Sequence, residues 1–67
     1  MMILILSPKP EEVAPPIERT GNQWAASATP EIPLKDYNWL VSWGYRHIIR
    51  DPALTAYRGR MINLHIS

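Results

Sequence analysis

A short apolar run near the amino terminus most constrains how this 67-residue chain can fold. Residues 2–6 are Met-Ile-Leu-Ile-Leu, with no polar side chain among them, and Ser7-Pro8 follows directly. A continuous run of branched and aliphatic side chains is typical of a strand that is buried on both faces. Such strands belong to parallel sheets that helices cover. The run therefore predicts an α/β fold. It is much shorter than the about 20 residues that a membrane span requires.

The remaining strands are predicted where β-branched and aromatic side chains gather between turn residues. These segments are residues 23–28, 37–43 and 60–67. Gly44 follows the third strand directly and permits a backbone turn or the close approach of a ligand. With residues 2–6, the chain is expected to have about four short strands.

Helical segments are fewer, because prolines interrupt the chain. Pro15-Pro16 follows a helical beginning at Glu11, which allows at most one turn of helix before an extended crossover. Asp51-Pro52 predicts a clear helix start, with Asp51 as the cap and Pro52 at the first helical position. Gly59 suits the position that ends this helix. The order of elements favours a partial Rossmann-like parallel sheet with one clear helix.

The composition excludes several kinds of site. No cysteine is present, so a disulfide framework and a thiolate zinc site are excluded. Two histidines stand without a cluster of other ligands, and we expect no metal site. A net charge of +1 does not favour binding of nucleic acid, although residues 37–67 carry four arginines and only one aspartate. Without cysteine or a secretory signal, a cytoplasmic location is expected.

Two stretches carry residues that could take part in catalysis or ligand binding. Asn63 and His65 lie two apart in a predicted strand, which places them on one face, where they could stabilise a developing oxyanion. The alternative is a polar pair at a strand edge, satisfied by neighbouring backbone. The segment from Ser42 to Ile49 follows the third strand, and ligands of open α/β sheets bind at such carboxyl ends. There, backbone amides could meet a flat heterocycle, or the side chains could simply pack.

Taken together, these stretches resemble the folate-dependent formyltransferases, the family of phosphoribosylglycinamide, methionyl-tRNA and sugar-nucleotide formyltransferases. The family has a glycine-aromatic segment that ends in two aliphatic residues, here Gly44-Tyr45-Arg46-His47-Ile48-Ile49. Its Asn-Leu-His-x-Ser motif is here Asn63-Leu64-His65-Ile66-Ser67, preceded by a Gly-Arg step. The match covers the last half of the chain closely and the first strand loosely. Most members have proline where Ile66 stands.

The resemblance implies transfer of a formyl group from 10-formyltetrahydrofolate to an amine. It assigns oxyanion stabilisation to Asn63 and His65, with His65 also placed to help proton transfer. It places the pterin of the donor against residues Gly44, Tyr45, Arg46, His47, Ile48 and Ile49. The acceptor would be an amine-bearing substrate such as an amino sugar nucleotide, an aminoacyl-tRNA or a ribotide.

The family continues beyond this motif with a Leu-Pro segment, a loop rich in arginine and glycine, and a catalytic aspartate. This sequence lacks them, and Asp36 and Asp51 match no catalytic position of the family. We therefore expect residues 1–67 to be an amino-terminal piece of a formyltransferase domain, inactive or nearly so alone. Its exposed sheet is expected to favour self-association. The alternative is a small stand-alone α/β binding or interaction module without catalysis.

Overall fold

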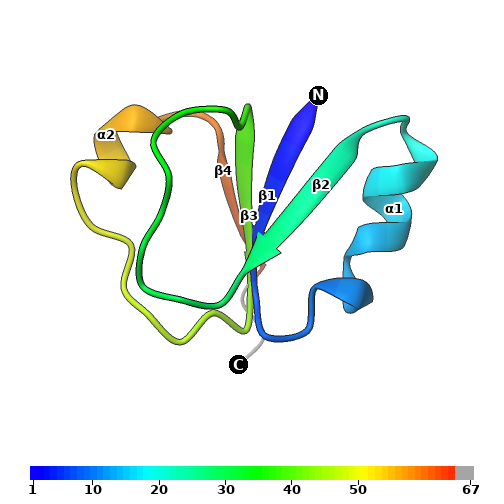
Figure 1. The fold of residues 1–67 in the computed structure, drawn as a ribbon, viewed down its shortest axis with the longest axis horizontal. Coiled ribbons are helices and arrows are strands. Elements are labelled where there is room, and N and C mark those ends of the chain that lie inside the picture. The colour runs from blue at the N-terminus through cyan, green and yellow to red at the C-terminus, as the bar shows by residue number, and fades with distance from the viewer. Residues whose placement is uncertain (65–67) are drawn as a thin grey trace.

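The computed structural model describes residues 1–64, which form one parallel sheet between two short helices (Figure 1). The elements in chain order are β1 (Met2–Leu6), the 3-10 turn η1 (Pro10–Glu12), α1 (Ala14–Arg19), β2 (Gln23–Ser27), β3 (Trp39–Trp43), α2 (Ala53–Ala56) and β4 (Met61–Leu64). The strands lie in the order β2-β1-β3-β4, and every neighbouring pair is parallel. The predicted α/β fold with a four-stranded parallel sheet is confirmed.

The central strand β1 is buried on both faces, as its unbroken apolar run predicts. Ile3 and Ile5 pack with Ala14 of α1 on one face of the sheet. On the other face, Leu4 and Leu6 pack with Tyr57, which follows α2 directly. Figure 1 shows the two helices on opposite sides of the sheet. Because adjacent strand residues point to opposite faces, a run without polar positions suits a strand that is covered twice.

The first crossover contains a helix, so the expectation of at most one helical turn before an extended segment is wrong. Pro15 and Pro16 lie in the first turn of α1, where a residue has no helical acceptor for its amide proton. The prolines therefore begin the helix and do not break it. The sheet consequently has two helices where one clear helix was expected. No helix within residues 1–64 has the length and apolar character needed to cross a membrane.

The second helix, α2, is a single turn that begins at Ala53, one residue later than predicted. Pro52 occupies the cap position, so the prediction that it is the first helical residue is wrong. Asp51 still serves the helix start, because its Oδ1 accepts hydrogen bonds from the amide of Thr55 at 2.9 Å and its hydroxyl at 2.7 Å. Gly59 has a φ of +77°, but it lies two residues after Tyr57, the C-cap of α2, so the prediction that it occupies the position that ends the helix is wrong.

Tyr57 connects the loop before β3 to the core on one face of the sheet. Tyr57 is 0% exposed, and its hydroxyl donates to the carbonyl oxygen of Pro33 at 2.6 Å. Burial raises the pKa of Tyr57 above its usual value of 10.0, and the nearby guanidinium of Arg60 opposes this shift. The neutral phenol is therefore the form that the folded chain favours.

A loss of stability at alkaline pH follows from this shift. The pKa of Tyr57 is higher in the folded chain than in the unfolded chain, so folding favours the protonated phenol. Its contribution to stability is complete below about pH 10 and is lost as the pH rises through the folded-state pKa. We expect the midpoint of urea unfolding to be lower at about pH 11 than at about pH 8. The difference between the two pH values should be smaller in Tyr57→Phe. Equal falls in both proteins would contradict this account.

Candidate functional site

Ser42 and Asn63 face each other where β3 and β4 end. The strand register pairs these two residues directly. The hydroxyl of Ser42, a residue only 5% exposed, donates to Oδ1 of Asn63 at 2.7 Å. With Oδ1 engaged, the Nδ2 group is the part of the Asn63 amide that is left to donate to a ligand. The pair therefore presents an oriented hydrogen-bond donor at the carboxyl edge of the sheet.

A cavity of about 390 Å³ lies beside this pair, and we call it the inner cavity. Its walls come from β3, β4, α2 and the segment that follows β3. The lining residues are Leu40, Ser42, Tyr45, His47, Ile48, Ile49, Leu54, Met61, Ile62 and Asn63. Most of these side chains are apolar, and Ser42 and Asn63 are polar groups on the strands. An apolar hollow with a few placed polar groups is the usual form of a small-molecule site.

The segment after β3 turns sharply and is fastened by Tyr45. Gly44 has a φ of +63°, a conformation that side-chain-bearing residues rarely adopt. The hydroxyl of Tyr45 donates to the carbonyl oxygen of Thr29 at 2.5 Å, and burial raises the pKa of this phenol. The rings of Tyr45 and His47 meet edge to face, with centroids 5.3 Å apart. The segment is thereby held against the loop before β3.

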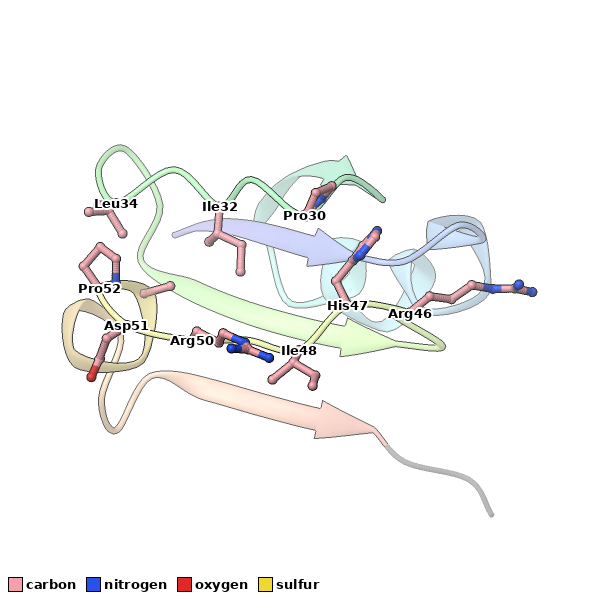
Figure 2. Close-up of a pocket in the computed structure, with 10 residues that line it drawn as sticks. Pro30, Ile32, Leu34, Arg46, His47, Ile48, Arg50, Asp51 and Pro52 are labelled. Atoms are coloured by element: carbon pink, nitrogen blue, oxygen red, sulfur yellow. The ribbon is translucent and has the colours of Figure 1, made fainter.

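A second hollow, of about 570 Å³, lies on the other side of this segment, and we call it the outer groove. Figure 2 shows Pro30, Ile32 and Leu34 from the loop before β3 along one side, facing the segment after β3. The residues that complete the lining are Arg46, His47, Ile48, Arg50, Asp51, Pro52 and Ala53. His47 and Ile48 border both hollows, so the inner cavity and the outer groove are neighbours.

Most of the residues singled out from the sequence gather around these hollows. Asn63 lines the inner cavity with Tyr45, His47, Ile48 and Ile49. Arg46 lines the outer groove, and Gly44 lines neither hollow. The predicted oxyanion residue His65 lies outside the described residues, so its placement stays a prediction.

Sequence reasoning gave Ser42 no role of its own. It stands in a strand of otherwise apolar and aromatic residues, which is a weak signal for a functional hydroxyl. Its importance depends on the pairing of β3 with β4, since only that register sets it opposite Asn63. A polar residue near the end of a buried strand was the one available clue.

The inner cavity can bind a flat apolar ligand and polarise one carbonyl group on it. The walls supply apolar contact, and the Asn63 amide supplies a donor for a developing oxyanion. Within residues 1–64, no group of three or more acidic or histidine side chains is placed to hold a metal ion. The described residues thus offer binding and hydrogen bonding to a carbonyl.

No protein-family model matches the chain, and no curated protein matches it either. The case for a function therefore rests on the residues and the geometry of the inner cavity and the outer groove.

Proposed function

We propose that this chain binds 10-formyltetrahydrofolate and presents its formyl group for transfer to an amine. The observation that supports this most is the composition of the inner cavity. Asn63 lines it together with Tyr45, His47, Ile48 and Ile49, so residues from both motifs that resemble the formyltransferases border one hollow. The proposed acceptor is an amine-bearing substrate, either an amino sugar nucleotide, an aminoacyl-tRNA or a ribotide.

The pterin of the donor would occupy the apolar part of the cavity. Ile48 and Ile49 come from the segment after β3, and Leu40 and Met61 from the strands. These side chains can contact a flat ring, while backbone groups of the segment can pair with the polar edge of the ring. A volume of about 390 Å³ falls within the usual range for a small-molecule pocket.

Asn63 would act on the formyl oxygen. As the nitrogen of the acceptor amine forms a bond to the formyl carbon, the carbonyl electron pair moves to the oxygen, and Nδ2 of Asn63 donates to that oxyanion. Collapse of the intermediate restores the carbonyl and breaks the bond to N10 of the donor. N10 gains a proton, and the attacking amine loses one. The resemblance assigns help with this proton transfer to His65.

Ser42 would keep Asn63 in the productive orientation. Its hydroxyl donates to Oδ1, so the amide cannot turn that oxygen toward the substrate without losing a part-buried hydrogen bond. A carbonyl oxygen turned toward the oxyanion would repel it. The hydrogen bond therefore supports the donor role that the proposal gives to Nδ2.

Calorimetry with paired ligands tests the proposal. The ligands are 10-formyl-5,8-dideazafolate, a stable analogue of the donor, and 5,8-dideazafolate, which lacks the formyl group. We expect Asn63→Ala to raise the Kd of the formyl ligand about fivefold, the effect of one hydrogen bond, and to leave the other Kd unchanged. Asn22→Ala is the matched control, because Asn22 lies at the opposite end of the sheet, just before β2.

Two results would count against formyl transfer. One is the absence of binding of either ligand to the unaltered chain, which would favour a module without catalysis. The other is an equal effect of Asn63→Ala on both ligands, because Asn63 would then contribute nothing specific to the formyl group.

A further inference from the structure

The outer edge of β2 has backbone groups without a partner strand. β2 stands at one end of the strand order, and within residues 1–64 it pairs with β1 alone. Figure 1 shows β2 in front of the other strands, with α1 and α2 to either side of it. The amide of Gln23 donates to the carbonyl oxygen of Met1 at 2.9 Å, so Gln23 faces β1. Because successive residues of a strand alternate in direction, Trp24 and Ala26 direct their amide and carbonyl groups away from β1.

Nothing in the sequence of β2 protects this edge. Natural proteins guard an edge strand with a charged side chain, a proline or a bulge, each of which prevents pairing with another chain. β2 reads Gln-Trp-Ala-Ala-Ser, with neither charge nor proline. It pairs with β1 through an unbroken register, so it contains no bulge. The edge therefore offers the donors and acceptors of two residues to an added strand.

Two surface recesses lie beside β2, one at its start and one at its end. The recess at the start, the Glu18 recess, has a volume of about 500 Å³. Its lining residues are Met2, Glu18, Asn22, Gln23 and Trp24. The recess at the end, the Glu31 recess, has a volume of about 450 Å³. Its lining residues are Leu4, Ala26, Ser27, Thr29, Glu31, Ile32, Pro33 and Tyr37. Each lining contains one exposed glutamate and neither lysine nor arginine.

We propose that the outer edge of β2 binds an extended, basic peptide segment of a partner protein as a fifth strand of the sheet. Hydrogen bonds to the backbones of Trp24 and Ala26 supply affinity, and the two recesses select lysine or arginine side chains. A second copy of the chain fits less well, because its β2 has no basic side chain and each copy brings its own two glutamates. The inference is independent of the proposed function, since the inner cavity lies at β3 and β4, on the other side of β1.

A nuclear magnetic resonance titration at low salt tests the proposal with the peptide Ac-Thr-Lys-Val-Thr-Val-Thr-Lys-Thr-NH2, which has a lysine for each end of β2. The backbone amides of Trp24 and Ala26 should move downfield, because they gain hydrogen bonds. The amides of Gln23 and Ala25, which face β1, should move less. The same peptide with glutamate in place of both lysines should bind at least about tenfold more weakly, since like charges then meet at both recesses.

Variants of the chain test the edge and the recesses separately. Ala26→Pro removes an outward amide and no hydrogen bond to β1, so the chain should fold and the Kd of the lysine peptide should rise at least about tenfold. Glu31→Gln should raise that Kd about threefold, the effect of one exposed ion pair. Glu11→Gln removes the same charge from η1, lines neither recess, and should leave the Kd unchanged. Circular dichroism checks the fold of each variant.

The outcomes are decisive in each case. Equal affinity for the two peptides, or the largest shifts on strands other than β2, would overturn the proposal. An equal rise of the Kd in Glu31→Gln and Glu11→Gln would reflect net charge alone and would overturn the role of the recesses. If the amides of Trp24 and Ala26 shift with protein concentration in the absence of peptide, a second copy occupies the edge, and the basic partner is wrong. If Ala26→Pro does not fold, the two peptides and Glu31→Gln still decide.

Discussion

Tyr57→Ala is expected to lower the urea midpoint of the chain steeply or to unfold the chain outright at room temperature. The side chain is 0% exposed and packs with Leu4, Leu6 and Leu40 in the core on the α2 face of the sheet. Truncating a buried aromatic residue to alanine costs about 3–5 kcal/mol. A domain of this size has a total stability of only about 3–10 kcal/mol. The substitution therefore removes a large part of the stability, or all of it.

Tyr57→Phe separates packing from hydrogen bonding in this experiment. It retains the ring and removes only the donor to Pro33, so we expect a cost of about 1 kcal/mol. Far-ultraviolet circular dichroism and urea unfolding measure both variants. An alanine variant that stays folded with an unchanged urea midpoint would show that the core does not depend on Tyr57.

Ile48→Asp should abolish most of the affinity for the donor without unfolding the chain. Ile48 is 73% exposed, so folding does not depend on burying it, yet it lines both hollows. A carboxylate at this place removes apolar contact with the pterin and must lose water when the ligand binds. We expect the Kd of the monoglutamate of 10-formyl-5,8-dideazafolate to rise at least about tenfold, from the loss of one apolar side chain.

Ile48→Leu is the matched control, because it keeps an apolar side chain of equal size. Its Kd should stay within about twofold of the unaltered value, since volume-conserving apolar exchanges cost little. The circular dichroism of both variants should equal that of the original chain. Unchanged affinity in Ile48→Asp would remove the segment after β3 from the donor site.

The strands could be predicted from the sequence because local composition determined them. The apolar run of β1 has no polar side chain that could face water, and this pattern predicts a strand that is buried on both faces. The start of α1 was misjudged for a different reason. Whether Pro15-Pro16 breaks a helix or begins one depends on where the preceding chain turns, and η1 completes that turn just before them.

The sequence could indicate the single stretches that contribute to the site, but not how they come together in space. The resemblance indicated Asn63 and the segment after β3 as separate stretches. Their meeting around the inner cavity follows from the pairing of β3 with β4, which no single stretch encodes. The same pairing gives Ser42 its partner. The groove with its two arginines depends on the course of the loop before β3, where Pro30 and Pro33 leave no regular pattern to interpret.

The most direct test of formyl-donor binding is a nuclear magnetic resonance titration of the chain with 10-formyl-5,8-dideazafolate. The predicted result is that the largest shifts fall on the backbone amides of Tyr45 to Ile49 and on the side-chain amide of Asn63. The ligand without the formyl group should shift the same backbone amides and leave the Asn63 side chain unmoved. No shift in either place, or the largest shifts around Glu18 of α1 and Trp24 of the edge strand β2, would contradict the account.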